Sequence, residues 1–172
     1  MNQAITSAAT SQSQIPALHR RVFGLEIIQG ATILDYGCGK YDKGRDFLLK
    51  NGAAEVLSYD PFNRTDEEND YAKQNVHKTT LLLCANVLNV VKADSRTIIA
   101  STLATISKRT GCAVYISVYE GDRSGWCRET TKGFQAHLRA SAYESLLRSF
   151  FSKVTRSGNT FICEITMAQR NR

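Results

Sequence analysis

The chain has 172 residues and a formal net charge of +6, from 22 Lys and Arg against 16 Asp and Glu. This length gives one domain a real hydrophobic core and leaves little room for a second. The longest nearly apolar run, residues 81–91, is too short to span a membrane. Residues 1–14 lack the basic start and apolar stretch of a secretory signal. We therefore expect a cytoplasmic protein without a membrane partner.

The five cysteines are odd in number, and none of them form a C-x-x-C pair. Four of them lie in apolar or strand-like segments, where Cys packs as a small core residue. We expect reduced thiols, with no disulfide framework and no metal site.

The chain begins with a segment rich in Ser, Thr, Ala and Gln, residues 1–14, which predicts a flexible tail. Residues 15–172 are assigned to a single domain. Four apolar residues at helical spacing predict a helix within residues 15–28. Short apolar segments then predict four strands, which alternate with two helical patterns. The strands are expected at residues 31–36, 55–59, 78–84 and 112–119, and the helices at residues 43–51 and 94–108.

The connecting and closing segments are more polar. Residues 63–75 predict a short helix or a mobile loop, and residues 121–133 predict a loop rich in Gly and charge. Ser141 and Glu144 have the spacing of a capping box, which predicts the start of a further helix. A Ser-Gly-Asn turn at residues 157–159 separates two closing strands and predicts a hairpin.

Strands that alternate with helices predict a parallel sheet covered by helices on both faces. The terminal hairpin adds antiparallel strands at one edge. The expected fold is therefore α/β, a Rossmann-like, doubly wound, mostly parallel sheet with a C-terminal antiparallel hairpin.

The strand at residues 31–36 runs into a Gly-x-Gly turn, Gly37 to Gly39. A nucleoside cofactor approaches the backbone closely at such a turn, and only Gly lacks the Cβ that would block it. The next strand ends at Asp60, whose carboxylate can accept the hydrogen bonds of an adenosine ribose. Nicotinamide enzymes share this layout, but their fingerprint has a small third residue where this chain has Asp42.

The segment Asp35-Tyr36-Gly37-Cys38-Gly39 resembles the cofactor motif of class I S-adenosylmethionine (SAM)-dependent methyltransferases. The resemblance implies that Asp35 faces the methionine end of SAM and fixes its amino group. The expected ligands are SAM and its product S-adenosylhomocysteine. The residues expected to bind them are Asp35, Tyr36, Gly37, Cys38, Gly39, Lys40, Asp60, Pro61 and Asn86.

Within that superfamily, the chain is most similar to methyltransferases associated with DNA phosphorothioation. The similarity lies in the cofactor motif, in Tyr59-Asp60-Pro61, in residues 86–90 with the sequence Asn-Val-Leu-Asn-Val, and in the Gly-rich segment 121–135 ending in Phe-Gln. The motifs of DNA amino-methylases, ribose 2′-O-methylases and cytosine-C5 methylases are absent after the third strand.

Polar side chains follow the third and fourth strands, at the edge where α/β sheets bind ligands. Asn86, Asn89 and Glu120 are the candidates for catalysis. The loop beyond the fourth strand joins acids, guanidinium groups and an aromatic plane that suit a bound substrate. The candidates for substrate binding are Asp122, Arg123, Trp126 and Arg128.

The leading hypothesis is methyl transfer from SAM to an unidentified acceptor. The charge of +6 slightly favours nucleic acid over a small molecule as acceptor and partner. Two alternatives remain open: a SAM-binding sensor or partner protein without transfer activity, and an enzyme that cleaves SAM.

Overall fold

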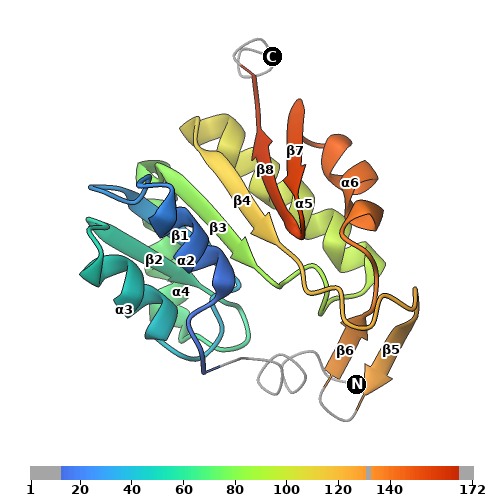
Figure 1. The fold of residues 1–172 in the computed structure, drawn as a ribbon. Helices are drawn as coiled ribbons and strands as arrows, with labels where there is room; N and C mark the ends of the chain where they lie inside the picture. Colours follow the sequence, from blue (N-terminus) through green and yellow to red (C-terminus); the bar gives the residue numbers. More distant parts are fainter. Residues whose placement is uncertain (1–12, 131–132, 167–172) are drawn as a thin grey trace.

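The computed structural model describes residues 13–130 and 133–166 (Figure 1). The expected flexible tail, residues 1–14, therefore lies outside the described residues except for its last two positions. No described helix is long and apolar enough to cross a bilayer.

A six-stranded sheet with the order β2-β1-β3-β4-β8-β7 forms the centre of the molecule. The first four of these strands pair in parallel, β8 pairs antiparallel with β4, and β7 pairs antiparallel with β8. The mostly parallel sheet and its C-terminal hairpin confirm the predicted fold. The strands are β1 (Thr32–Tyr36), β2 (Glu55–Tyr59), β3 (Leu81–Ala85), β4 (Ala113–Ser117), β7 (Lys153–Ser157) and β8 (Thr160–Glu164).

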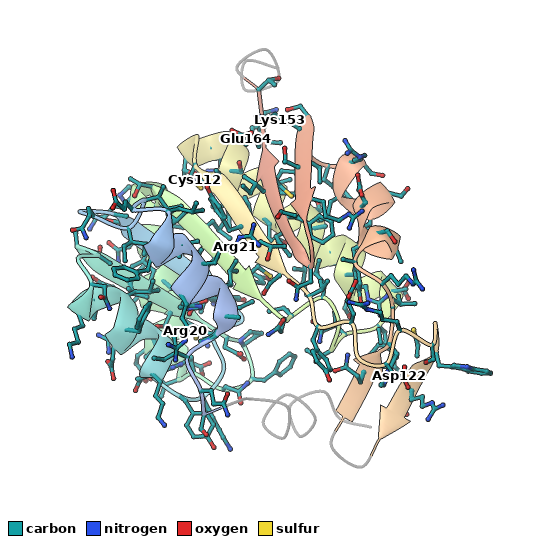
Figure 2. All side chains as sticks on the ribbon, in the orientation of Figure 1. Arg20, Arg21, Cys112, Asp122, Lys153 and Glu164 are labelled. Atoms are coloured by element: carbon teal, nitrogen blue, oxygen red, sulfur yellow. The ribbon has the colours of Figure 1, made fainter. Side chains whose placement is uncertain are left out.

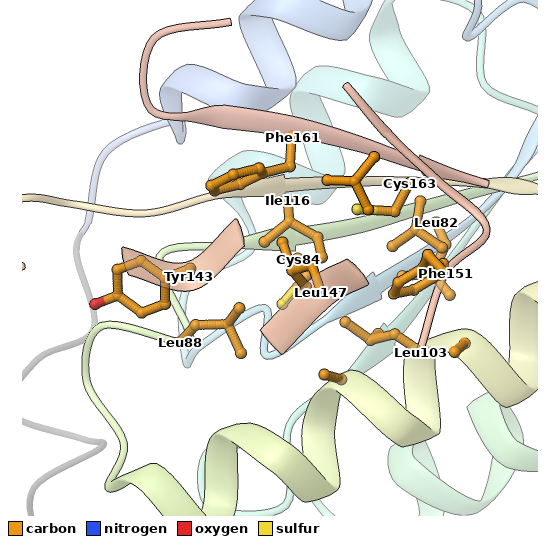
Figure 3. Packing of buried hydrophobic residues seen from close by; sticks show 14 of the residues in the cluster. Leu82, Cys84, Leu88, Leu103, Ile116, Tyr143, Leu147, Phe151, Phe161 and Cys163 are labelled. Atoms are coloured by element: carbon orange, nitrogen blue, oxygen red, sulfur yellow. The ribbon is translucent and has the colours of Figure 1, made fainter. Parts of the chain in front are cut away.

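Helices cover both faces of this sheet, because alternate side chains of the strands feed two separate apolar clusters. In β3, Leu82 and Cys84 join one cluster, whereas Leu81 and Leu83 join the other. The first cluster, part of which Figure 3 shows, contains residues of α4 (Asp66–Asn75), α5 (Ala93–Thr110) and α6 (Ser141–Arg148). The second contains residues of α2 (Ala17–Gly24) and α3 (Lys43–Lys50).

The prediction of a loop at residues 121–133 is partly wrong. The segment contains β5 (Cys127–Thr130), which pairs antiparallel with β6 (Gly133–Ala136). Figure 1 shows this hairpin apart from the main sheet. Each of its strands has four residues and lacks the apolar–polar alternation of a half-buried strand, so the sequence carried little signal for them.

The capping box predicted at Ser141 and Glu144 does not form. The residue before α6, Ala140, has helical dihedral angles, and no side chain caps the helix there. Glu144 instead pairs with Arg148 and Arg156. The residues 63–75 contain α4, and its N-terminus carries a capping box between Thr65 and Glu68.

Candidate functional site

The candidate site lies at the carboxyl ends of β1 and β3. The chain leaves β1 toward β2 on one side, and β3 lies on the other side, so the strand order reverses at this point. Open α/β sheets bind their ligands in the crevice outside such a reversal. The fold therefore brings the predicted cofactor turn to the expected edge of the sheet.

The glycine turn, residues 37–39, needs its glycines. Gly37 and Gly39 have φ angles of 75° and 71°, in the left-handed region that disfavours other residues. A Cβ on Gly37 would also collide with the side chain of Val87. The amide of Gly37 donates to Tyr59 O at 2.7 Å, which holds the turn against the end of β2.

Asp60 holds the glycine turn and the loop that follows β2. Its Oδ2 accepts from Gly39 N at 2.9 Å, and its Oδ1 accepts from Phe62 N, Asn63 N and Asn63 Nδ2. Only one of these bonds uses Oδ2, so that oxygen keeps room to accept a ribose hydroxyl. The carboxylate is buried, with 5% of the residue exposed.

Sequence reasoning missed two residues that complete this arrangement. Arg64 donates from Nε to Gly39 O at 2.9 Å, and from Nη1 to Asp42 Oδ1 at 2.6 Å. Asn69 on α4 bonds the backbone of Asp60 at both N and O. Asp60 and Arg64 together bond the amide and the carbonyl of Gly39. The one sequence signal for Arg64 was its place four residues after the candidate ribose acid.

Asp35 lies beneath the glycine turn and contacts a histidine that sequence reasoning did not single out. Asp35 Oδ2 lies 2.8 Å from His19 Nε2 on α2, and both side chains are buried. The other carboxylate oxygen, Oδ1, is buried without a hydrogen-bond partner. The residue predicted to meet the SAM amino group therefore has one free oxygen.

The other predicted cofactor residues surround the turn. The Tyr36 ring packs on Tyr59, with the centroids 4.9 Å apart, and burial raises the pKa of its hydroxyl. Burial raises the pKa of the Cys38 thiol to about 12, so this thiol is protonated and unreactive near neutral pH. Lys40 is exposed with its Nζ 5.0 Å from the centroid of the Tyr41 ring, and Pro61 is exposed.

The two asparagines proposed for catalysis have different surroundings. Asn86 directly follows β3 with φ 58°, and its Oδ1 accepts from Ser117 Oγ at 3.5 Å. Asn89 is buried, and its Oδ1 accepts from Tyr119 N at 3.1 Å. Its Nδ2 donates to Gln135 Oε1 at 3.5 Å. Asn89 therefore ties the end of β4 to β6, whereas Asn86 is half-buried at the crevice.

Both carboxylate oxygens of Glu120, the third candidate for catalysis, accept hydrogen bonds from the protein. Its Oε1 accepts from Ala140 N at 2.6 Å, and Arg123 Nε donates to its Oε2 at 2.8 Å. The bond from Ala140, followed by the contact with Arg123, lowers the pKa of this carboxyl group. A carboxylate held in this way is a weak proton acceptor at neutral pH.

The predicted substrate residues lie farther out. Asp122 is exposed, with its Oδ1 3.0 Å from His137 Nδ1. Trp126, directly before β5, and Arg128, within β5, are also exposed. In Figure 2, Asp122 lies beside the β5–β6 hairpin, well apart from α2, where Arg20 is labelled. The structure thus brings the cofactor candidates together but leaves the substrate candidates spread over an exposed surface.

A groove opens next to these residues. It lies between the segment that follows β4 and the turn that joins β7 to β8. Its volume is about 680 Å³, and its charged lining consists of three arginines and Glu120. The full lining is Tyr119, Glu120, Gly121, Arg123, Arg139, Ser141, Arg156, Gly158 and Asn159. An excess of guanidinium groups suits a phosphate or carboxylate.

Metal ligands do not gather in the part of the chain that the structure describes: no three His, Cys, Asp or Glu side chains there could share a metal ion. None of the five cysteines, all of which lie within the described residues, forms a disulfide.

No protein-family model matches the chain, and no curated protein sequence matches it. Solved structures do share its fold. The crystal structure of Burkholderia thailandensis 1,6-didemethyltoxoflavin-N1-methyltransferase, with bound 1,6-didemethyltoxoflavin and S-adenosylhomocysteine, matches with a TM-score of 0.60 and 16% identity. The match covers 88% of this chain and 80% of that one.

Two further structures match at a TM-score of 0.56. Magnesium protoporphyrin IX methyltransferase from Synechocystis, with bound S-adenosylhomocysteine, is 15% identical over 86% of this chain and 78% of that one. A Rhodobacter sphaeroides protein, described provisionally as a Zn-dependent alcohol dehydrogenase, is 12% identical over 95% of this chain and 98% of that one. At these identities the similarity shows the fold alone, a Rossmann-like fold that methyltransferases adopt. Nothing in these matches links the chain to methyltransferases associated with DNA phosphorothioation.

Proposed function

We propose that this chain is a SAM-dependent methyltransferase. The observation that carries the proposal is the glycine turn at the carboxyl end of β1, whose Gly39 is bonded by Asp60 and Arg64. Asp42 in the third position of the motif disfavours a nicotinamide cofactor. The shared fold with methyltransferases that hold S-adenosylhomocysteine supports the same reading.

The residues of the site fit the parts of SAM. A buried carboxylate oxygen without a partner, Asp35 Oδ1, suits the amino group. Asp60 Oδ2, which accepts one hydrogen bond, suits a ribose hydroxyl. The absence of a Cβ at Gly37 lets the side chain of Val87 pack against the turn and hold its shape.

SAM supplies a methyl group on a sulfonium, which is a strong electrophile, so the protein acts mainly by positioning the acceptor. A general base is required only where the acceptor keeps its proton at neutral pH. Glu120 and Asn89 both accept hydrogen bonds from backbone amides of the protein. We therefore give them a structural role, in which they fix the segments on the acceptor side of the crevice. Asn86, half-buried at the end of β3, is the candidate that faces the reacting groups.

For the acceptor, we propose a molecule that carries a phosphate or carboxylate group. The groove beyond β4 is lined by Arg123, Arg139 and Arg156 and by the acid Glu120. Arg123 pairs with Glu120 and Arg156 pairs with Glu144, so Arg139 is the lining guanidinium outside these two pairs. Nucleic acid and a small anionic molecule would both supply this chemistry. The net charge of +6 and the resemblance to phosphorothioation-associated methyltransferases are the arguments for nucleic acid.

The test is incubation of the protein with methyl-labelled SAM in separate reactions with DNA, RNA and a fractionated extract of small metabolites. Label transferred to one fraction identifies the acceptor class, and Arg139→Gln should lower the transfer severalfold without changing SAM affinity. Binding of SAM without transfer to any fraction would favour the sensor reading. Breakdown of SAM without an acceptor would favour cleavage.

A further inference from the structure

A buried imidazole–carboxylate pair joins α2 to β1 beneath the glycine turn. His19 Nε2 and Asp35 Oδ2 are 2.8 Å apart, although the residues are 16 positions apart in the chain. His19 is 0% exposed and Asp35 is 3% exposed. Burying two such groups in an apolar cluster costs free energy, so their retention requires a compensating contact or a function.

The packing around the pair is close. A Cβ on Gly44 of α3 would approach His19 Nε2 to 3.0 Å, so the glycine lets α3 lie against the imidazole. Leu18 and Val22, on either side of His19 in α2, are fully buried in the same apolar cluster. The imidazole therefore has a fixed position, and through the hydrogen bond it fixes one oxygen of Asp35.

Each partner keeps one buried atom without a hydrogen bond, Asp35 Oδ1 and His19 Nδ1. When Nε2 carries the proton that Asp35 accepts, Nδ1 is a neutral acceptor. Asp35 Oδ1 belongs to a carboxylate, and leaving it unpaired is the more costly of the two. A cationic hydrogen-bond donor is the group that would satisfy it best.

The charge of Asp35 affects the pKa of two neighbouring thiols. Burial, and after it the charge of Asp35, raises the pKa of Cys38 in the glycine turn to about 12. The same two causes raise the pKa of Cys84 near the end of β3. In the sheet, Asp35 lies opposite Leu83 of β3, at the boundary between β1 and β3 where the switch-point crevice opens. Because Asp35 Oδ1 is buried, a ligand that bonds it must displace the atoms that cover it.

We infer that His19 is a positioning residue for the cofactor: it holds Asp35 so that the second carboxylate oxygen receives the amino group of SAM. This inference rests on the proposed function. Helix α2 thereby takes part in ligand selection, because it lies outside the glycine motif and its His19 fixes the acid within that motif.

The test compares two ligands that differ in one group, S-adenosylhomocysteine and its deamino analogue, in which hydrogen replaces the amino group. Calorimetric titration of the wild-type protein should show at least tenfold weaker binding of the deamino analogue. In His19→Leu this difference should fall below threefold, because Asp35 loses the donor that orients it. Affinity for the deamino analogue itself should change little.

Three variants control the experiment. Val22→Ala opens a cavity in the same helix without touching Asp35, and it should keep the tenfold difference. His19→Gln retains a hydrogen-bond donor and should restore part of the difference. Asp35→Asn keeps the shape of the side chain but removes its charge, and it should abolish the difference as His19→Leu does.

A measurement on the wild type keeps the inference testable if His19→Leu fails to fold. In a nitrogen-edited NMR spectrum of the imidazoles, the His19 Nε2 proton should be protected from exchange. S-adenosylhomocysteine should shift this signal, and the deamino analogue should not.

An unchanged tenfold difference in His19→Leu, or equal shifts of the His19 signal with both ligands, would overturn the inference and leave the proposed function standing. Failure of the wild-type protein to bind either ligand would instead overturn the proposed function.

Discussion

The cofactor half of the crevice, residues 32–69, differs from the acceptor half, residues 117–159, in what its polar side chains bind. In the first half, Asp60, Arg64 and Asn69 bond backbone atoms of the segments that surround the glycine turn. In the second half, Glu120 also bonds a backbone amide, but the predicted substrate residues Asp122 and Arg123 are exposed and pair with neighbouring side chains. A segment held through its backbone is preorganised for one fixed ligand, whereas exposed side chains leave the choice of acceptor to local chemistry.

The largest expected effect comes from a methyl group at the glycine turn. Gly37→Ala should destabilise the protein by about 2–4 kcal/mol, because the left-handed backbone disfavours a Cβ and that Cβ overlaps Val87. Urea unfolding measures the loss. Binding of S-adenosylhomocysteine, measured by calorimetry, should be lost with it.

The acceptor half supplies the matched control, Gly125→Ala. Gly125 also has a positive φ, 84°, but a Cβ there meets no atom within 4 Å. This change should cost only about 1 kcal/mol, from backbone strain, and leave ligand affinity unchanged. Equal costs for the two substitutions would contradict the difference between the halves. Val87→Ala should recover part of the stability lost in Gly37→Ala.

A smaller effect is expected from Asp60→Asn. The amide keeps one acceptor oxygen and turns an NH₂ group toward backbone donors, so about 2 kcal/mol of stability should be lost. Affinity for S-adenosylhomocysteine should fall more than tenfold. Asp66→Asn, a change of the same kind in the first turn of α4, is the control and should leave affinity unchanged. An Asp60→Asn protein with wild-type affinity would remove Asp60 from the cofactor site.

In the acceptor half, Glu120→Gln should leave cofactor affinity within about twofold, because the side chain bonds Ala140 and Arg123 and not the glycine turn. Since the fold lowers the pKa of Glu120, its contribution to stability is present above the unfolded pKa and lost as the pH falls through the lower folded pKa. The variant should therefore lose less stability than the wild type between pH 5 and pH 3, as measured by thermal unfolding. An identical acid profile would show that this carboxylate gains nothing from its contacts.

The smallest expected effect is that of Trp126→Ala. Trp126 is 64% exposed, so stability should stay within about 0.5 kcal/mol of the wild type, and cofactor affinity should not change. The transfer rate with the true acceptor should fall if the indole stacks on it. A loss of S-adenosylhomocysteine binding in this variant would contradict the separation of the two halves.

Much of the fold follows from local pattern in the sequence. The run at β3 is apolar on both faces because helices pack on both sides, and Gly111 ends α5 in the left-handed conformation. The glycine turn and Asp60 were predictable for the same reason, since the turn requires particular residues at particular positions. The β5–β6 hairpin was not, because its short strands carry no apolar alternation.

The supporting residues of the site could not be predicted from local pattern. His19 meets Asp35 across 16 residues, and Arg64 meets Gly39 across 25. Such contacts depend on how α2 and α4 dock on the sheet, which spacing along the chain does not specify. Conversely, Glu120 and Asn89 carry groups suited to catalysis, but the fold uses those groups to bond its own backbone.

The central claim is that the glycine turn binds SAM, and the most direct test is calorimetric titration of the wild-type protein with S-adenosylhomocysteine and, separately, with NAD. We predict micromolar binding of S-adenosylhomocysteine, which corresponds to about −8 kcal/mol, and no measurable binding of NAD. Binding of NAD without binding of S-adenosylhomocysteine would contradict the account.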